Sequence, residues 1–193
     1  MKKLVCLMAA AALVLLAGSA VWAQPKAGLD LHGIYGFNYS DDDAELEKGW
    51  GGGASLVLCL GEFVKLDLGG DYIRPEIKDV AGDNYVQMIP VTGTLRIGGN
   101  LDVIYLYGGG GAGYSFNDLD LDDSAAEDLV DLEDCFTYHA CGGVEIFFSP
   151  QIALRGEFRY VWMEPKLKTK ATGDKDDWNM DHMQARAGIN LYF

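Results

Sequence analysis

The chain has 193 residues, 49% of them hydrophobic, and its 15 Lys and Arg against 29 Asp and Glu give a formal net charge of −14. This acidity excludes nucleic acid as a partner, because a nucleic-acid-binding domain carries a basic face. The length fits a single domain.

The first 23 residues have the features of a secretory signal peptide. Lys2 and Lys3 precede an apolar run from Leu4 to Ala17, and small residues lie before Gln24. We therefore expect cleavage after Ala23 and a single exported domain over residues 24–193. A membrane-spanning helix needs ~20 apolar residues, and the remaining sequence has no such stretch, so a membrane location requires strands.

Eight later segments alternate between apolar and polar residues, the pattern of half-buried β-strands. They cover residues 28–39, 50–60, 63–73, 84–97, 101–116, 136–148, 151–162 and 178–193. Tight turns at 61–62, 98–100 and 149–150 alternate with long charged loops at 40–49, 74–83, 117–135 and 163–177. Short turns at one end and long loops at the other are typical of membrane barrels, so we predict an all-β, eight-stranded, antiparallel up-and-down transmembrane β-barrel.

Charged residues in these segments share one face. In segment 151–162, Ile152 and Phe158 lie on one side, whereas Arg155 and Glu157 lie on the other. A soluble barrel would expose the charged face to water. A lipid-facing arginine costs ~2–4 kcal/mol at the bilayer midplane, so a membrane barrel must hold the charges inside, where opposite signs pair. The predicted network in the barrel lumen contains Lys65, Asp67, Asp71, Arg96, Glu145, Arg155, Glu157, Arg159 and Arg186.

Aromatic residues concentrate at the segment ends, which predicts two girdles at the membrane interfaces. The girdle beside the long loops comprises Tyr39, Trp50, Tyr72, Tyr114, Tyr138, Trp162 and Trp178, and the one beside the turns comprises Phe63, Phe148, Tyr192 and Phe193.

Three stretches resemble the small outer-membrane β-barrel proteins of the OmpA/OmpW type, often described as porin-like. They are the terminal RAGINLYF of residues 186–193, RGEFRY at 155–160 and the Gly-rich YGGGGAGY at 107–114. The resemblance covers residues 24–193 and implies a location in the bacterial outer membrane. It also implies that Ile189, Leu191 and Phe193 form the signal read by the barrel-assembly machinery. The stretch from Tyr160 to Phe193 looks somewhat like OmpW, whose family is linked with passage of small hydrophobic molecules.

The long loops suggest weaker hypotheses. Lys166, Lys168 and Lys170 are predicted to contact lipopolysaccharide phosphates or the acidic loops, with a solvated loop as the alternative. The aspartates at 118, 120 and 122 begin like a calcium loop, but Asp123 and Leu129 stand where glycine and glutamate are required. Residues 124–127 form a capping box, which predicts a short helix over 125–133.

Three functions remain open from the sequence. The first is a structural or surface-interaction barrel with a lumen largely filled by side chains, since eight strands enclose little more than side chains. The second is a narrow channel for small or hydrophobic molecules, and the distant third is a lipid-modifying enzyme. His32, His139 and His182 fall on inward positions, away from the lipid-facing wall where a lipid-modifying enzyme would act. His32 and His182 are expected at heights too different to share a metal, so we predict no catalytic site, no metal and no cofactor. The expected partners are outer-membrane lipid, lipopolysaccharide and the barrel-assembly machinery, with the protein a monomer.

Overall fold

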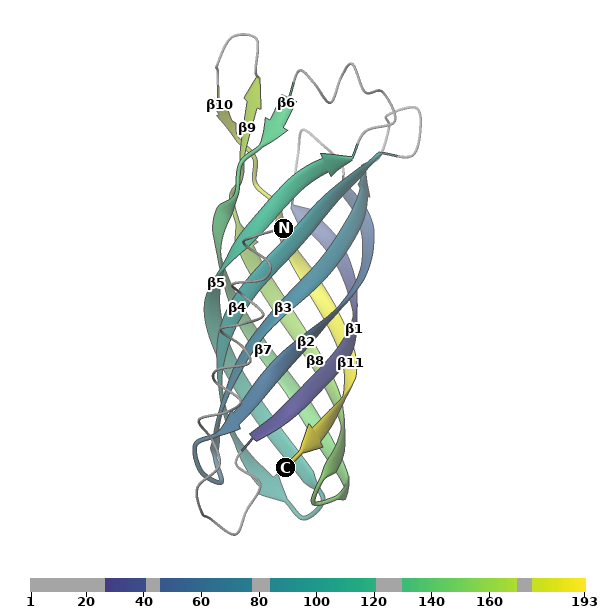
Figure 1. Ribbon diagram of the computed structural model, residues 1–193, viewed down its shortest axis with the longest axis vertical. Helices are drawn as coiled ribbons and strands as arrows, with labels where there is room; N and C mark the ends of the chain where they lie inside the picture. Colours follow the sequence, from purple (N-terminus) through teal and green to yellow (C-terminus); the bar gives the residue numbers. More distant parts are fainter. Residues whose placement is uncertain (1–26, 41–45, 78–83, 121–129, 170–174) are drawn as a thin grey trace.

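A computed structural model describes residues 27–40, 46–77, 84–120, 130–169 and 175–193. Eight long strands form one closed antiparallel barrel (Figure 1), as the sequence predicts. They are β1 (Ala27–Ser40), β2 (Leu46–Cys59), β3 (Val64–Ile77), β4 (Tyr85–Leu101), β5 (Ile104–Asp120), β7 (Cys135–Ser149), β8 (Ile152–Met163) and β11 (Asp181–Tyr192). Among these residues no helix is long and apolar enough to cross a membrane.

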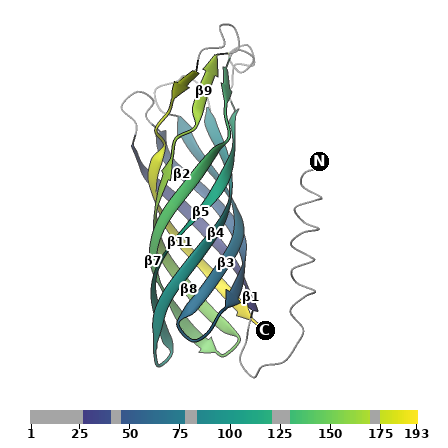
Figure 2. The same cartoon turned by 90° about the vertical axis from the view of Figure 1, so that its left-hand side faces the viewer.

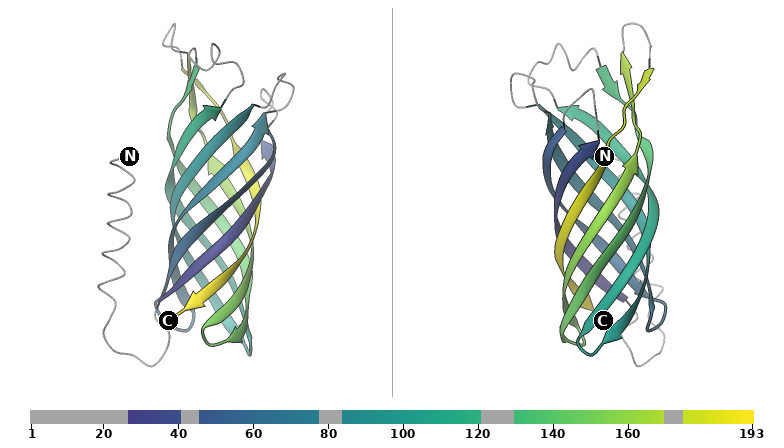
Figure 3. Two further views of the ribbon diagram at one scale, coloured as in Figure 1. Left: turned by 45° about the vertical axis from the view of Figure 1, so that its right-hand side comes forward. Right: turned by 180° about the vertical axis from the view of Figure 1, so that it is seen from behind.

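The first and last strands close the barrel. β1 pairs with β2 on one side and with β11 on the other, in a register that runs from Gly28 opposite Tyr192 to Phe37 opposite Met183. Figure 3 shows the two strands side by side, with the C-terminus at the end that carries the short turns. We call this end the turn end and the opposite one the loop end.

A second, smaller sheet stands on the loop end. β6 (Val130–Leu132), β9 (Lys166–Thr169) and β10 (Lys175–Asp177) pair in the order β10-β9-β6 and rise beyond the barrel (Figure 2). The helix predicted over 125–133 is therefore wrong for residues 130–132, because an antiparallel partner in β9 satisfies their backbone. Residues 121–129 lie outside the described residues, as does the predicted signal peptide.

One predicted turn is misplaced. Residues 98–100 continue β4, with Gly98 opposite Tyr107 and Asn100 opposite Tyr105. The chain reverses instead at Asp102, whose φ of 58° lies in the left-handed region that aspartate tolerates in tight turns.

The barrel has an apolar outer face and a buried inner face. Phe158 is 65% exposed on the outside, whereas its neighbour Glu157 is 3% exposed. Most predicted girdle residues point outward, including Trp50, Trp162, Tyr72, Tyr138, Phe63, Phe148 and Phe193. Three girdle predictions are wrong. Tyr192 is buried in the lumen, and Tyr39 and Trp178 pack against apolar side chains inside the loop end.

Candidate functional site in the barrel lumen

The lumen nearer the turn end is filled by ionic side chains. All the predicted lumen charges are buried there, and Asp30 joins them from β1. The layer balances its full charges: the acids are Asp30, Asp67, Asp71, Glu145 and Glu157, and the bases are Lys65, Arg96, Arg155, Arg159 and Arg186. Opposite charges at contact distance offset the cost of removing each group from water. We call this set the ionic layer.

Glu145 on β7 connects several strands at the bottom of the ionic layer. Its carboxylate accepts hydrogen bonds from Lys65 at 2.5 Å, Tyr192 at 2.8 Å and Asn190 at 2.9 Å, and also from Arg96. Arg96 donates a further hydrogen bond of 2.6 Å to Asp67. A single carboxylate on β7 therefore links side chains from β3, β4 and β11.

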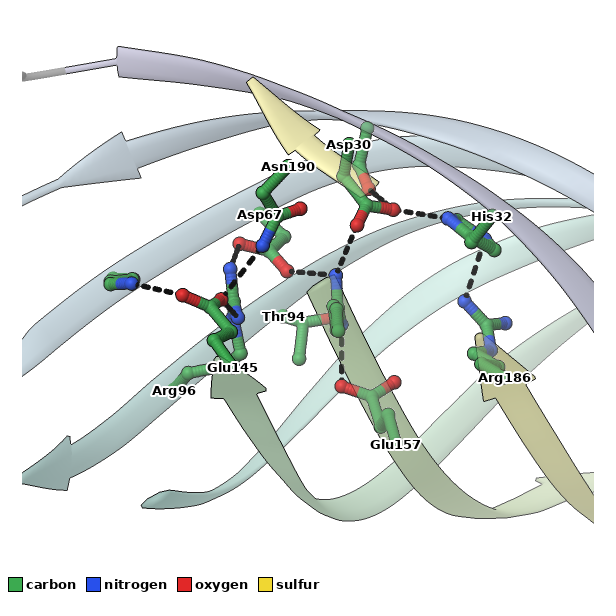
Figure 4. Close-up of polar contacts among 12 residues, drawn as sticks. Asp30, His32, Asp67, Thr94, Arg96, Glu145, Glu157, Arg186 and Asn190 are labelled. Atoms are coloured by element: carbon green, nitrogen blue, oxygen red, sulfur yellow. Dashed lines mark hydrogen bonds and ion pairs between the residues drawn. The ribbon is translucent and has the colours of Figure 1, made fainter. Parts of the chain in front are cut away.

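Arg155 occupies the centre of the ionic layer. Its Nη1 lies 3.3 Å from Asp30 and 3.2 Å from Asp67, while Nη2 pairs with Glu157. Figure 4 labels these three carboxylates. Its Nε donates to the hydroxyl of Tyr107 at 3.0 Å. The guanidinium thus joins carboxylates from three different strands across the width of the barrel, which leaves the axis blocked at this level.

His32 lies between two carboxylates, on the side of the layer nearer the loop end. Its Nδ1 contacts Asp30, and its Nε2 lies 3.3 Å from a guanidinium nitrogen of Arg186 (Figure 4). The same Nε2 lies 2.9 Å from Asp71, with which Arg186 also pairs. His32 was predicted to lie inside, but neither Asp30 nor His32 was among the residues predicted for the charge network. Asp30 and His32 lie at the same alternate positions of β1 as the buried Ile34. This alternation is the sequence pattern that could have placed both in the network.

The lumen nearer the loop end contains a buried apolar cluster, which was not predicted from the sequence. Its buried cluster comprises Ile34, Leu46, Ile73, Val86, Met88, Leu119, Leu132, Cys135, Met163 and Met180, with Tyr39 and Trp178 packed against it. On β3 and on β8 the charged residue lies toward the turn end, and the apolar ones follow toward the loop end: Asp71 precedes Ile73, and Arg159 precedes Val161 and Met163. We call this set the apolar layer.

A small cavity separates the two layers. Arg159, Arg186 and Asp71 line it on the ionic side, and Met88 and Met163 on the apolar side. It leaves about 20 Å³ for a water-sized sphere, which is room for one or two water molecules. The described histidines also belong to the interior: His139 contacts Thr94 at 2.8 Å, and His182 stacks on Tyr39.

The seam between β3 and β4 is weakly bonded beside this cavity. The register stays constant from Gly70 opposite Val91 to Ile73 opposite Met88 and on to Glu76 opposite Tyr85. Within these strands, pairing is interrupted twice, at the positions where Pro90 and Pro75 stand. Proline has no N–H to donate to a ladder, so the strands stay in register but lose hydrogen bonds there.

The remaining predicted residues lie outside the lumen. Ile189, Leu191 and Phe193 are exposed on the outer face at 51%, 41% and 66%. Lys166 pairs with Asp177 at 3.0 Å within the small sheet, and Lys168 lies opposite Asp131 and Lys175. Lys170 is outside the described residues. The thiols of Cys59, Cys135 and Cys141 are free.

The small sheet holds a second ion pair, between Lys175 and Glu133 at 2.5 Å. The hydrogen bond from Lys175 lowers the pKa of Glu133, and the hydrogen bond to Asp177 raises the pKa of Lys166. Among the described residues, no three His, Cys, Asp or Glu side chains are grouped so that they would hold a metal ion.

Comparison with known families gives a match over residues 8–193 to the family described as the outer membrane protein beta-barrel domain. A comparison with curated proteins finds no match.

Several solved structures share the fold. The outer membrane protein OprG from Pseudomonas aeruginosa has a TM-score of 0.65 at 13% identity, with 90% of this chain and 99% of that chain covered. Outer Membrane Protein W of E. coli has 0.57 at 14% identity, with 89% and 100% covered. Ail, the attachment invasion locus protein of Yersinia pestis, has 0.53 at 12% identity, with 88% and 100% covered.

Proposed function

The chain belongs to the outer membrane protein β-barrel domain family, and on that premise we propose that it is a barrel of the bacterial outer membrane, closed along its axis, with a structural or surface-interaction role. The ionic layer carries this proposal. Arg155 is 3% exposed and in contact with carboxylates from three strands, so ions would have to break several buried pairs to pass. An eight-stranded barrel encloses only enough space for such side chains.

Single-channel recording in planar bilayers tests this closure. The wild-type protein should show no conductance steps, whereas a variant with Arg155→Ala and Glu157→Ala should conduct because it removes the central pair. The outer-face variant Arg74→Ala is the control and should stay silent. Regular steps from the wild-type protein would contradict a closed axis.

The small sheet is the part of the barrel that we place at the cell surface. We propose lipopolysaccharide phosphates as the partners of Lys166, Lys168 and Lys170. Lys166 already pairs with Asp177, so a phosphate has to compete with a carboxylate at that site. Replacing the three lysines with glutamine should weaken binding of purified lipopolysaccharide, and an unchanged affinity would remove this partner.

A second function is favoured by the β3–β4 seam: lateral movement of small apolar molecules between the loop end and the bilayer. The seam lacks hydrogen bonds at Pro90, and Pro90 lines the cavity below the apolar layer. An apolar molecule that entered from the loop end would be stopped by the ionic layer. It would then leave sideways, through the β3–β4 seam at Pro90.

Uptake of the apolar dye N-phenylnaphthylamine by cells tests the lateral path. Pro90→Val supplies the missing N–H and should slow uptake that depends on the protein. Pro150→Ala, at a turn, is the matched control and should leave uptake unchanged. Equal uptake by the wild-type and Pro90→Val proteins would refute the path.

We propose no catalytic role. A lipid-modifying enzyme needs a nucleophile and a base at the lipid-facing wall, but His139 and His182 are buried inside and His32 is engaged by two carboxylates.

A further inference from the structure

The small sheet ends in a strand with one unpaired edge. β6 pairs with β9, and in the described part of the chain no strand pairs with its other side. The N–H of Glu133, which follows β6, donates to the carbonyl of Lys166 in β9 at 2.8 Å. Because the backbone groups of successive residues in a strand point to opposite sides, those of Leu132 point away from β9. Unpaired strand edges of this kind are templates for a further strand.

A hollow of about 460 Å³ lies beside this edge. Residues 131–134 line it on the side of the small sheet, and Tyr114 and Asn117 of β5 line it on the side of the barrel. The ladder between β5 and β7 ends at Ser115 opposite Cys135, although β5 itself continues. The hollow therefore lies between the last residues of β5 and the free edge of β6.

The two walls of the hollow differ in the backbone donors that they offer. On β5, the N–H of Asn117 donates to the carboxylate of Asp134 at 3.1 Å, and the N–H of Leu119 donates to that of Asp118 at 3.0 Å. Side chains thus hold the donors of β5. On β6, the direction of the ladder leaves the N–H and the carbonyl of Leu132 facing the hollow. An added strand would accordingly pair with β6.

The side chains of β6 select the kind of strand that can pair with it. Residues 131–133 read Asp-Leu-Glu, with the two acids on one face and Leu132, which is 3% exposed, on the other. On β9, residues 166–168 read Lys-Leu-Lys, and each lies opposite its complement. Opposite charges directly across a ladder stabilise it, and like charges destabilise it. A second copy of β6 would bring acids opposite acids, so the edge suits a segment in which basic and apolar residues alternate.

We infer that the free edge of β6 binds an extended segment of a partner protein in which basic and apolar residues alternate, as a fourth strand of the small sheet. The basic residues of that segment stand beside Asp131 and Glu133, and its apolar residues stand beside Leu132. In this mode of recognition, main-chain hydrogen bonds supply affinity and alternate side chains supply specificity. The inference rests on the surface-interaction role proposed above and gives that role a partner class.

Binding of fluorescently labelled peptides to the protein in phosphatidylcholine nanodiscs tests the edge. The probe is the peptide TKLKLKT, and its isomer TKKLLKT has the same charge without the alternation. The alternating peptide should bind about tenfold more tightly, because only it places lysines and leucines on opposite faces of a strand. Equal affinities would overturn the inference and leave only the attraction of a cationic peptide to an acidic surface.

N-methylation of the probe tests the pairing without any change to the protein. In a strand that sets a leucine opposite Leu132, the leucine N–H groups face β6 and the lysine N–H groups face away. Methylation of both leucine nitrogens should weaken binding about tenfold, through the loss of main-chain hydrogen bonds. Methylation of two lysine nitrogens should have a much smaller effect. Equal effects of the two modifications would overturn the pairing.

Asp131→Asn supplies the test from the side of the protein. It removes an exposed charge beside the free edge and keeps the backbone of β6, so the affinity for the alternating peptide should fall about threefold. Asp176→Asn removes the same charge from β10, at the opposite edge of the sheet, and is the matched control with no expected change. No loss in Asp131→Asn, or an equal loss in Asp176→Asn, would overturn the inference.

Failure of the edge is distinguishable from failure of the proposed closed barrel. A wild-type protein that binds neither peptide and shows no conductance steps would overturn the edge and leave the closed barrel standing. Conductance steps would contradict the closed barrel whichever peptide binds.

Discussion

The Nζ of Lys65 on β3 lies 2.9 Å from the hydroxyl of Tyr192 on β11, a contact that joins residues 127 positions apart in sequence. The same ammonium lies over the rings of Tyr105, Phe147 and Tyr192, at 4.2, 5.3 and 4.8 Å from their centroids. Contacts of a cation with ring faces add to the attraction when water is excluded. The turn end of the lumen is therefore held together across strands that are not neighbours in the barrel.

Glu145→Gln should be strongly destabilising. Glu145 is fully buried and accepts from Lys65, Arg96, Asn190 and Tyr192. The amide keeps the shape but removes the negative charge, which leaves buried cations without full compensation. We expect a loss of about 3–5 kcal/mol in the free energy of unfolding, measured by urea unfolding in lipid vesicles.

The matched control for that measurement is Glu62→Gln, at an exposed turn. It should change stability by no more than about 0.5 kcal/mol. If Glu145→Gln fell within the same margin, the ion pairs of the turn end would not be what stabilises the closed barrel.

Two adjacent glycines of β5 should differ sharply in their tolerance of alanine. A Cβ at Gly109 would lie 2.4 Å from the carbonyl oxygen of Leu95, whereas a Cβ at Gly108 meets nothing closer than 3.9 Å. Gly109→Ala must shift the backbone of β4 and should cost about 1–3 kcal/mol, the range for overpacking. Gly108→Ala should be close to neutral. Heat-modifiable migration and urea midpoints of the two variants give the comparison, and equal midpoints would contradict it.

The sequence predicted the wall of the barrel well because the wall follows simple rules. Alternation with period 2 places every second residue inside, and an arginine such as Arg155 has no inexpensive position facing lipid. Tight turns that need glycine or proline mark strand ends. These rules depend on neighbours in the chain, so they identify the strands and the inner face without knowledge of the pairing.

The contents of the lumen were harder to predict because they depend on contacts across the barrel. The alternation of inward and outward positions puts Met88 and Met163 inside the barrel. Alternation alone does not show that both lie at the same height, on the loop-end side of Arg159. Likewise, Tyr39 and Trp178 look like girdle residues at strand ends, and only the packing of the loop end shows that they contact the apolar layer. The cavity between the two layers is lined by side chains from six strands, which no local pattern describes.

Acid should loosen the small sheet before the barrel. The Lys175 hydrogen bond lowers the pKa of Glu133, so the pair contributes stability above the ordinary glutamate pKa of about 4.3, and that contribution is lost as pH falls through the lowered value. The raised pKa of Lys166 acts in the opposite range, because its pair with Asp177 weakens only as pH rises through the lysine pKa. The sheet is therefore expected to be most stable between these limits.

Hydrogen exchange checks this prediction. The backbone amides of residues 130–132 should lose protection below about pH 4, while those of β7 keep theirs. Glu133→Gln should remove most of this pH dependence and leave a constant, lower protection. Protection that falls equally in both proteins would assign the acid response to other groups.

Phe193 should matter for assembly and not for the stability of the finished barrel. Its ring is 66% exposed on the outer face and contributes nothing to the ionic layer, while its backbone closes the barrel through mutual hydrogen bonds with Ala27. Phe193→Ala keeps those backbone bonds. It should therefore change the free energy of unfolding of refolded protein by no more than about 0.5 kcal/mol. It should also lower the amount of folded protein that reaches the outer membrane of cells.

Leu29→Ala, which removes an exposed outer-face side chain of β1, is the control. It should not lower the amount of folded protein in the outer membrane as Phe193→Ala does, and it should leave the stability of refolded protein nearly unchanged. If Phe193→Ala assembled in cells at the wild-type level, the terminal phenylalanine would not be read by the barrel-assembly machinery in this protein.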